Sequence, residues 1–413
     1  MTPAARLQAA IDILGEIERS RAPADRIIEH WGRAHRFAGS KDRAAIAERV
    51  FQIVRRRSEC AWAMQSSSPR DWVLGALKRI DAMPADEIET LFAGEGYGPP
   101  PLSDDERKRL LAPVTPMSPE IVGGYPAWVT SEIERAYGRH MQEEMVAYLD
   151  RAPVDLRANT LKTDRANLEH ALAKEGAQTE PRVLTPWALR VVAGASPRQL
   201  TRTAAFDRGL YEIQDTGSQA AALMTHARAG ETVVDLCAGA GGKALALAAM
   251  MANKGRILAC DVNAPRLDEM KTRAARAGAQ NIERATLPPD WPQSPCAALT
   301  ALAGKAHRVL IAAPCSGSGT WRRNPETKWR LKPDDLDAFA QMQSRLLAAA
   351  APLLRPEGTL TYVTCSLFPK ENEDVVAAFL AAHPHLRKAA ERRFSPNTTG
   401  TDGFYVCTLE AAP

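Results

Sequence analysis

The second half of the chain alternates short runs of strand-forming residues with alanine-rich helical stretches. From residue 206 onward, such runs occur at 232–237, 256–261, 308–313 and 359–364. This alternation predicts a parallel sheet covered by helices on both faces. Ligands of such sheets bind at the carboxyl ends of the strands. The residues that follow each run are therefore the first candidates for a functional site.

A glycine-rich turn follows the first run. Residues 235–243 read Asp-Leu-Cys-Ala-Gly-Ala-Gly-Gly-Lys and lead into a predicted helix at 244–251. Glycine permits a tight turn and a close approach of the backbone to a ligand, and the start of a helix offers free N–H groups. A nucleotide-binding P-loop is excluded, because that motif requires Gly at position 237 and Ser or Thr at position 244, where Cys237 and Ala244 stand.

The second run ends in an acidic residue that extends this pattern. Asp261 follows Gly239 by about 20 residues, the spacing at which a carboxylate accepts hydrogen bonds from the ribose hydroxyls of a bound nucleoside. Turn, helix and acid together predict a site for an adenosine-containing cofactor. The pattern does not distinguish a nicotinamide dinucleotide from S-adenosylmethionine.

A cysteine follows each of the last two runs. Cys315 stands in the segment 312–320, Ala-Ala-Pro-Cys-Ser-Gly-Ser-Gly-Thr, and Cys365 in the segment 362–366, Tyr-Val-Thr-Cys-Ser. A single cysteine at such a place is usually a small buried apolar residue, whereas two on the ligand side of one sheet indicate a chemical role. No Cys-x-x-Cys pair occurs among the seven cysteines, so neither a zinc ribbon nor a thioredoxin-like site is expected, and we expect no metal.

Composition narrows the remaining classes of protein. No apolar run approaches the roughly 18 residues of a membrane span. The N-terminus has no long apolar core, which argues against a secretory signal. Seven widely spaced cysteines do not suit a disulfide framework. We therefore expect a monomeric cytoplasmic protein with reduced thiols and no membrane partner.

Basic residues concentrate in two segments. Residues 1–60 hold twelve Lys or Arg against eight Asp or Glu, and their apolar residues recur at helical spacing, which predicts a helical bundle with a basic exterior. Such a surface suits a phosphate backbone, although an ordinary solvated bundle face has the same pattern. Residues 305–332 carry seven Lys or Arg, one Glu and two tryptophans, a mixture that suits an unstacked nucleic-acid strand. The cations expected to contact RNA there are Arg322, Arg323 and Lys328.

Two further segments separate the basic helices from the sheet. Residues 94–104 are rich in Gly and Pro and predict a linker or long loop. Residues 116–205 mix helices with short strands, with strands expected at 155–159 and 188–192 around a helix at 164–175, as in a small α+β module. We therefore expect three parts, at residues 1–115, 116–205 and 206–413.

Three of these motifs carry a resemblance to a known family. Residues 235–243, 314–329 and 364–366 resemble the RNA cytosine-carbon-5 methyltransferases of the Sun/Fmu (RsmB-type) family, and Pro-Cys-Ser-Gly-x-Gly-x-x-Arg-Arg-Asn-Pro is the most specific match. The resemblance is strong over residues 206–413. It implies an α/β fold, a Rossmann-like S-adenosylmethionine-dependent methyltransferase domain. An all-helical domain, which resembles the NusB-like RNA-binding domain, and a small α+β (RRM-like) module would precede it.

The resemblance also implies an activity. The family methylates carbon 5 of a cytosine in RNA, here most naturally small-subunit (16S) ribosomal RNA, with S-adenosylmethionine as cofactor. A thiolate that adds to carbon 6 of cytosine makes carbon 5 nucleophilic, which is covalent catalysis. By resemblance, Cys365 is the nucleophile and Cys315 assists its release. The implied cofactor-binding residues are Cys237, Ala238, Gly239, Ala240, Gly241, Gly242, Lys243 and Asp261.

Two positions depart from the family pattern. The family has Asp immediately before Ala-Pro-Cys, where this chain has Ala312. That Asp lies against the target base and supports its protonation as the cysteine adds, so its loss is expected to cost about 2–4 kcal/mol of transition-state stabilisation. The family also places an acidic residue after the third strand, near the adenine, whereas residues 285–290 offer only Asp290.

Two other functions stay open at this point. Because Ala312 replaces the family Asp, the alternative is a catalytically weakened or inactive RNA-binding or ribosome-assembly protein on the same fold. The glycine turn and Asp261 alone would also suit an NAD-dependent oxidoreductase. That function leaves both cysteines and the basic segment 305–332 unexplained.

Overall fold

The chain folds into two compact units. A computed structural model describes residues 1–113 and 115–412. The first unit comprises Met1–Arg151 and the separate segment Thr320–Leu331, and the second comprises Ala152–Gly319 and the chain from Lys332 onward. A short segment that follows Cys315 in the sequence therefore belongs to the N-terminal unit.

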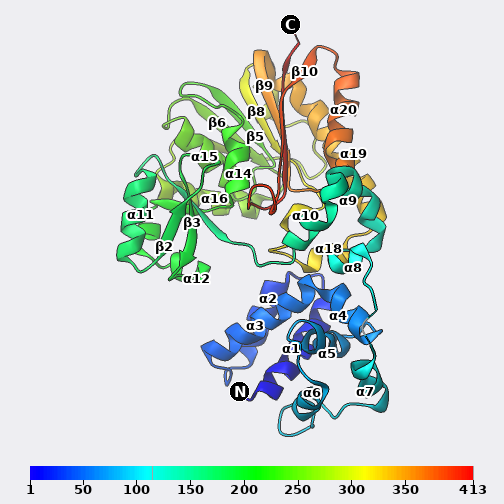
Figure 1. Ribbon diagram of the computed structural model, residues 1–413. Coiled ribbons are helices and arrows are strands. Elements are labelled where there is room, and N and C mark those ends of the chain that lie inside the picture. The colour runs from blue at the N-terminus through cyan, green and yellow to red at the C-terminus, as the bar shows by residue number, and fades with distance from the viewer. Residues whose placement is uncertain (114, 413) are drawn as a thin grey trace. The chain divides into compact units, whose positions relative to one another are not determined.

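The first unit is helical, as the apolar spacing of its sequence predicts (Figure 1). Helices α1, α3 and α5 bury Ile13, Val50 and Leu74 in one core. The Thr2 side chain accepts a hydrogen bond from the Ala5 N–H and caps the start of α1. The helices are α1 (Pro3–Arg19), α2 (Ala24–Ala34), α3 (Ser40–Arg55), α4 (Arg57–Met64), α5 (Pro69–Arg79), α6 (Ala85–Leu91), α7 (Asp104–Leu111), α8 (Pro119–Val122), η1 (Ala127–Val129), α9 (Thr130–Tyr137), η2 (Gly138–His140), α10 (Met141–Ala147) and α18 (Glu326–Arg330).

The Gly/Pro-rich segment predicted as a linker or long loop at 94–104 lies in the loop between α6 and α7, except for its last residue, Asp104, which begins α7. The segment at 116–205 was predicted to form the α+β module, but its first part has a different structure. From α8 to α10 it is helical and belongs to the first unit, and the first strand begins at Val154. The boundaries drawn at residues 115 and 205 remain predictions.

A small antiparallel sheet opens the second unit. Its strand order is β2-β3-β1-β4, and α11 buries Leu168 and Leu172 against it. The strands and the helix predicted for this module are confirmed, and the sheet takes its last strand from residues beyond 205. Its elements are β1 (Val154–Ala158), α11 (Arg165–Lys174), β2 (Gln178–Pro181), β3 (Ala188–Ala193), α12 (Pro197–Leu200), α13 (Ala204–Asp207) and β4 (Tyr211–Ile213).

The large sheet has seven strands in the order β10-β11-β9-β8-β5-β6-β7. The five strands from β9 to β7 in this order are mutually parallel, as predicted. At the other edge β11 runs antiparallel to both β9 and β10, so the whole sheet is mixed. Its elements are α14 (Thr216–Leu223), β5 (Thr232–Leu236), α15 (Gly242–Met250), β6 (Arg256–Asp261), α16 (Ala264–Ala277), β7 (Ile282–Thr286), α17 (Ala297–Thr300), β8 (Ala306–Ala312), η3 (Ser318–Thr320), α19 (Pro333–Ala350), η4 (Ala351–Leu353), β9 (Leu354–Thr364), η5 (Pro369–Glu371), α20 (Glu373–Ala382), β10 (Leu386–Phe394) and β11 (Phe404–Ala411).

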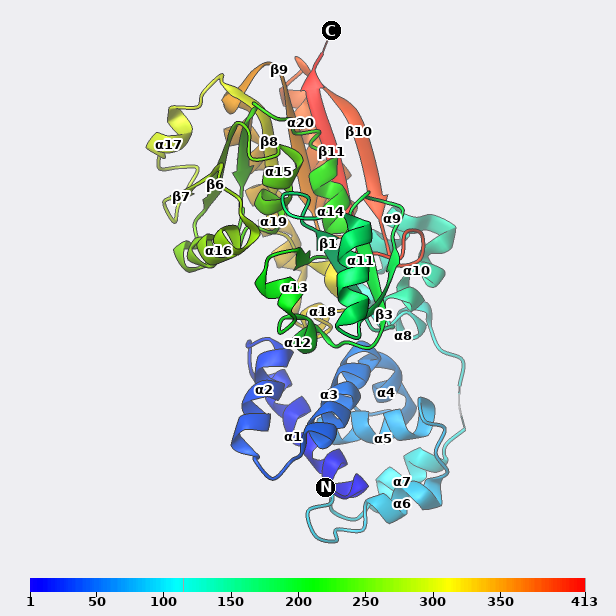
Figure 2. The same ribbon diagram turned by 90° about the vertical axis from the view of Figure 1, so that its left-hand side faces the viewer.

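Helices cover both faces of the large sheet (Figures 1 and 2). Because side chains alternate along a strand, Val233 packs with Leu247 of α15 on one face and Val234 packs in the cluster of α19 and α20 on the other. Helices α14, α15 and α16 cover the first face. Within the described residues, no helix combines the length and apolar character needed to cross a membrane.

Close packing of α4 against α5 generates a stability prediction. A Cβ atom on Gly75 would lie 2.1 Å from the Cys60 carbonyl oxygen, which is backbone and cannot rotate away. Gly75→Ala is therefore expected to lower the free energy of unfolding by about 1–3 kcal/mol, measured by urea unfolding followed by circular dichroism. The matched control is Gly32→Ala in α2, whose Cβ would meet only the flexible Arg43 side chain at 3.4 Å. An unchanged urea midpoint for Gly75→Ala would contradict the packing argument.

Candidate active site

The carboxyl ends of β5, β8 and β9 lie next to one another, because these strands are neighbours in the sheet. Ala312 at the end of β8 pairs with Val363 near the end of β9. The loops that follow therefore leave the sheet at the same edge. Cys315 and Cys365 stand on these two loops, and their Sγ atoms lie 3.4 Å apart, in contact as a hydrogen-bonded pair. The structure thus brings together the two cysteines that the sequence singled out.

Backbone contacts also join the two cysteine loops. The Gly319 N–H donates to the Cys365 carbonyl at 2.8 Å, and the Gly403 N–H donates to the Gly319 carbonyl at 2.8 Å. A Cβ atom on Gly319 would lie 2.1 Å from the Gly403 carbonyl oxygen. The glycine in this part of the motif is therefore required by close backbone packing against the segment that precedes β11.

The two sulfur atoms differ in their electrostatic surroundings. The hydrogen bond from Cys315 lowers the pKa of the Cys365 thiol; burial opposes this effect, and the charge of Lys243 adds to it. The same hydrogen bond and burial raise the pKa of the Cys315 thiol. The pair therefore favours a thiolate on Cys365 and a proton on Cys315.

The other cysteines with shifted pKa values move in the opposite direction. Burial raises the pKa of Cys237 and of Cys407 to about 12. Burial also raises the pKa of Cys60 and of Cys260. Because a nucleophilic cysteine needs thiolate character, Cys365 is the candidate nucleophile among the described cysteines.

Two buried residues behind the cysteine pair were missed in the sequence. Glu371 accepts hydrogen bonds from the Ser316 N–H at 2.9 Å, from the Ser316 hydroxyl at 2.6 Å and from the Ser366 hydroxyl. The Asn372 side-chain amide donates to the Ser366 carbonyl at 2.9 Å. The only available signal was an acid and an amide shortly after Cys365, which alone would not distinguish a site from a surface turn.

The predicted cofactor turn connects β5 to α15. Gly239 and Gly241 have φ of 54° and 83°, a region that favours glycine. A Cβ atom on Gly241 would lie 2.4 Å from Cγ of Met270 in α16. Cys237 has φ of 60° without being glycine, which costs on the order of 1–3 kcal/mol and is typical of functional sites.

Asp261 holds this turn in place. Its Oδ2 accepts a hydrogen bond from the Gly239 N–H at 2.7 Å, and its Oδ1 accepts one from the Asn263 N–H at 2.8 Å. Each carboxylate oxygen can accept a second hydrogen bond. Asp261 can therefore fix the glycine turn and still accept hydrogen bonds from ribose hydroxyls.

Asp235 provides a test of whether the turn suits a cofactor. Its side chain is fully buried, and both carboxylate oxygens lack a hydrogen-bond partner in the described chain. Burial raises the pKa of Asp235 to about 7; the charge of Lys243 and the nearby Ala244 N–H lower it only in part, without meeting the geometry of a hydrogen bond. Buried polar groups without partners are rare and call for a ligand or water. The ammonium group of S-adenosylmethionine is a donor of the kind this carboxylate lacks, so the residues present fit the cofactor.

Two arginines orient the carbonyl groups of the turn. Arg157 in the small sheet donates to the Gly242 carbonyl at 2.8 Å, and Arg273 in α16 donates to the Ala240 carbonyl at 2.7 Å. Burial lowers the pKa of Arg157 to about 10, so the guanidinium is still charged at neutral pH. The arginines therefore fix the carbonyl oxygens of the turn, while the N–H groups of Ala238, Gly239 and Gly241 donate to the Cys260 carbonyl, to Asp261 and to the Ala238 carbonyl.

The three predicted RNA contacts lie in the segment that belongs to the first unit. Arg322 and Lys328 are buried, and Arg323 is half-buried. The Lys328 ammonium donates to the Arg55 carbonyl at 2.7 Å, and the Arg55 guanidinium donates to the Arg322 carbonyl at 3.1 Å. Burial lowers the pKa of Lys328. That Arg322 and Lys328 contact RNA remains a prediction, and their burial in this packing does not favour it.

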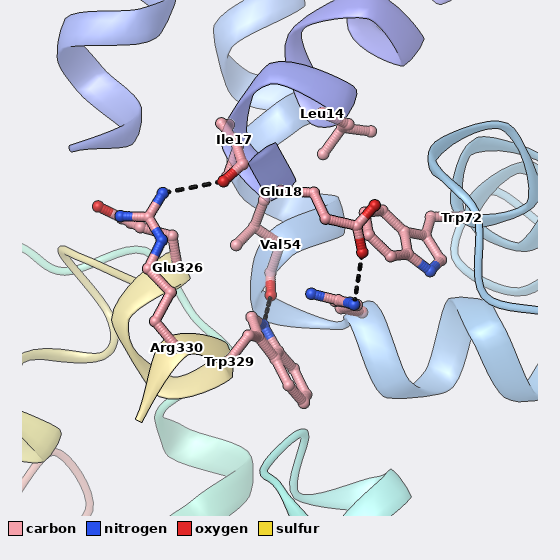
Figure 3. A pocket seen from close by; sticks show the side chains of 9 residues that line it. Leu14, Ile17, Glu18, Val54, Trp72, Glu326, Trp329 and Arg330 are labelled. Carbon is pink, nitrogen blue, oxygen red and sulfur yellow. Dashed lines mark hydrogen bonds and ion pairs between the residues drawn. The ribbon is translucent and has the colours of Figure 1, made fainter. Parts of the chain in front are cut away.

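The same segment lines a cavity of about 180 Å³ within the first unit (Figure 3). The Trp329 indole N–H donates to the Val54 carbonyl at 2.8 Å, and Arg330 donates to the Ile17 carbonyl at 3.0 Å (Figure 3). These carbonyls lie in the last turns of α3 and α1, where they have no partner within the helix. The segment is therefore anchored by capping two helices.

The fold and the site define a class of protein. The large sheet has seven strands, of which β9, β8, β5, β6 and β7 are parallel, with a glycine turn after β5 and an acid at the end of β6. This is a Rossmann-like methyltransferase fold. Residues 222–410 match the family described as 16S rRNA methyltransferase RsmB/F, and residues 125–196 match the ferredoxin-like domain of RsmF/B-like methyltransferases.

Relatives and a solved structure agree with this class. The chain is 32% identical over 303 residues to the probable ribosomal RNA small subunit methyltransferase B of Bacillus subtilis, covering 69% of this chain and 66% of that protein. It is 32% identical over 307 residues to the protein of the same name from Synechocystis sp., covering 70% and 67%. A solved methyltransferase homologue from Pyrococcus horikoshii is 26% identical, with a TM-score of 0.61 over 71% of this chain and 98% of that one. The chain belongs to the RsmB/F family, and its alignments span about two thirds of the length of these curated relatives.

Proposed function

We propose that the protein transfers a methyl group from S-adenosylmethionine to carbon 5 of a cytosine in small-subunit ribosomal RNA. The observation that carries the proposal is the 3.4 Å contact between Cys315 and Cys365 at the sheet edge where the glycine turn begins. Membership of a family described as 16S rRNA methyltransferases supports the choice of substrate. We propose that the protein acts as a monomer in the cytoplasm.

The chemistry begins with covalent activation of the base. The Cys365 thiolate forms a bond to carbon 6 of cytosine, and the electron pair of the carbon 5–carbon 6 double bond becomes available at carbon 5. S-adenosylmethionine, when bound, supplies the methyl group that carbon 5 takes. The proton on carbon 5 then passes to a base, the double bond re-forms, and the sulfur of Cys365 leaves as a thiolate.

Cys315 is proposed to assist the departure of Cys365. Its thiol keeps a proton and donates a hydrogen bond to the Cys365 sulfur, which favours the anionic form of the leaving group. Lys243 adds a positive charge near the same sulfur. Both effects favour the thiolate before the attack and again after the release.

The glycine turn is proposed to hold the cofactor. Asp261 would accept hydrogen bonds from the ribose, and Asp235 would accept them from the ammonium group. Lys243 would lie near the carboxylate of the methionine part. The full set of proposed cofactor-binding residues is Cys237, Ala238, Gly239, Ala240, Gly241, Gly242, Lys243 and Asp261, with Asp235 added.

The RNA contacts are proposed from charge. The basic helices of residues 1–60 and the half-buried Arg323 would bind the phosphate backbone. The Lys328 side chain and the Arg322 main-chain carbonyl are assigned to holding their own segment against α3.

A weakened RNA-binding protein on the same fold is the second candidate. Ala312 cannot donate a hydrogen bond, accept one or carry charge, so the step in which the base is protonated loses its family carboxylate. RNA binding does not depend on that side chain. The two candidate functions therefore differ in whether the protein catalyses methyl transfer, whereas both require the same fold and both bind RNA.

Methyl transfer from labelled cofactor to 16S ribosomal RNA tests the proposal directly. The protein is expected to label the RNA, and bisulfite sequencing is expected to find one or more protected cytosines that are absent without the protein. Cys365→Ser is expected to abolish labelling while cofactor affinity, measured by calorimetry, stays unchanged. Tight RNA binding without any label in the unaltered protein would favour the second candidate.

The role of Cys315 predicts a trapped intermediate. A serine hydroxyl has a far higher pKa than a thiol, so Cys315→Ser is expected to slow release and let the RNA–protein adduct accumulate. A denaturing gel of reactions with labelled RNA should show a retarded band for this variant. The double variant Cys315→Ser with Cys365→Ser should lack the band, and its persistence there would refute the assignment of the nucleophile.

Restoring the family carboxylate tests the account of position 312. Ala312→Asp is expected to raise kcat roughly 100-fold, because an acid beside the base supports its protonation in the transition state. Steady-state methylation kinetics measure the change. Ala312→Asn, similar in size but uncharged, is the control and is expected to give a smaller gain. Equal rates for the Ala, Asn and Asp forms would contradict this account.

A further inference from the structure

Glu371 is a buried carboxylate that the proposed chemistry does not use. The residue has no exposed surface, and its carboxylate accepts hydrogen bonds from both polar groups of Ser316, from the Ser366 hydroxyl and from the Gln343 amide at 3.1 Å. No lysine or arginine pairs with it in the described chain. A buried charge without a cation is costly unless hydrogen-bond donors surround it, and here four donors do so.

The donors come from the two loops that carry the cysteines. Ser316 directly follows Cys315, and Ser366 directly follows Cys365. One carboxylate oxygen accepts from both serine hydroxyls, so it connects the loops after β8 and β9 at a single point. The Gln343 amide on α19 also donates to the Pro314 carbonyl at 2.9 Å, which fixes the first loop from behind.

The carboxylate also acts on the thiols through its charge. Its negative charge adds to the hydrogen bond and the burial that raise the pKa of Cys315, and it works against the hydrogen bond that lowers the pKa of Cys365. Lys243 opposes this effect at Cys365, and Asp402 adds to it. Another titratable neighbour is the buried Tyr362, whose hydroxyl donates to the Glu371 main-chain carbonyl at 2.7 Å.

We propose that Glu371 is the positioning residue of the cysteine pair. It anchors the residue after each cysteine, sets the two sulfur atoms at hydrogen-bonding distance, and restrains the pair to a single negative charge. The proposal rests on the proposed methyl transfer and deepens it by naming what holds the nucleophile. The hydrogen bonds of the Glu371 carboxylate go to Ser316, Ser366 and Gln343 and to neither sulfur, so it acts through the loops and through its charge.

Replacing Glu371 by glutamine tests the effect of its negative charge on the cysteines separately from the effect of its hydrogen bonds and volume. The side chain of Glu371→Gln has nearly the same volume, and the two serine hydroxyls can rotate to accept hydrogen bonds from the new amide. The fold and the loop contacts are expected to persist while the negative charge disappears. Removing a negative charge near a thiol favours the thiolate, so the pH at which Cys365 becomes reactive is expected to fall.

Alkylation of Cys365 measures this effect without any methyl transfer. The reduced full-length protein is treated with iodoacetamide at a series of pH values, and the modified peptide is quantified by mass spectrometry. The half-point of the Cys365 profile is expected to move to lower pH in Glu371→Gln. The matched control is Glu231→Gln, which lies before the amino end of β5 and whose carboxylate pairs with Arg308 at 2.9 Å. A Glu371→Gln profile that coincides with the unaltered and control profiles would overturn the proposal.

Kinetics of a truncated side chain test the anchoring. Glu371→Ala removes all four hydrogen bonds, and kcat is expected to fall roughly 100-fold with KM for RNA unchanged, as for a misplaced nucleophile. Ser366→Ala removes the bond between Glu371 and the second loop, together with the contacts of the same hydroxyl to the Phe368 N–H, Ser316 and Ser318. It serves if Glu371→Ala fails to fold, and a smaller loss in kcat is expected. Wild-type kcat in a folded variant would reject the anchoring role. If the unaltered protein methylates no RNA while the alkylation profiles still separate, the methyl-transfer proposal fails and the positioning role stands.

Discussion

The contact between the sulfur atoms of Cys315 and Cys365 is the interaction on which the site depends, and it exists because β8 and β9 are parallel neighbours. Parallel strands deliver their carboxyl ends to the same edge, so two loops that are far apart in the sequence begin side by side. A register slip of one residue would turn every side chain of a strand to the opposite face. The pairing of Ala312 with Val363 therefore sets where both loops start.

The glycine turn contributes to the chemistry of the cysteines as well as to ligand binding. The charge of Lys243 at its end acts in the same direction on two groups. It adds to the hydrogen bond from Cys315 that lowers the pKa of Cys365, and it offsets part of the burial that raises the pKa of Asp235. A thiolate in a buried site needs compensation for lost solvation, and a hydrogen bond from Cys315 with a nearby cation supplies part of it. Because one lysine acts on both groups, loss of the turn would disturb the Cys365 thiol even before a cofactor binds.

Much of the large sheet could be predicted from the sequence, because each parallel strand is a local apolar run followed by a turn. The glycine turn and both cysteines were found for the same reason. The antiparallel edge formed by β10 and β11 was not predicted, since pairing between strands is a long-range property that no local pattern records. The helices α8 to α10 were assigned to a mixed module because short helices and strands share similar apolar runs.

Buried polar residues were the hardest part of the site to predict. Lys328 looked like a nucleic-acid contact because cations and tryptophans surround it in the sequence, yet in the structure its ammonium binds a carbonyl at the end of α3. Composition does not record whether a cation meets solvent or an unpaired helix carbonyl. Asp235 and Glu371 escaped for the related reason that an acid in a sequence does not reveal its burial. Only the fold shows that one lacks partners and the other has four.

The position of Ala312 shows which step of the proposed reaction bears the cost of its missing carboxylate. The effects that favour the Cys365 thiolate come from Cys315 and Lys243, and neither involves the side chain at position 312. Thiolate formation should therefore be intact. Glu371 cannot replace the absent acid, because its oxygens are occupied by donors of the two loops. The missing carboxylate therefore affects the protonation of the base as sulfur adds to it. A protein with Ala312 should have a reactive Cys365 thiol but a slow methyl-transfer reaction.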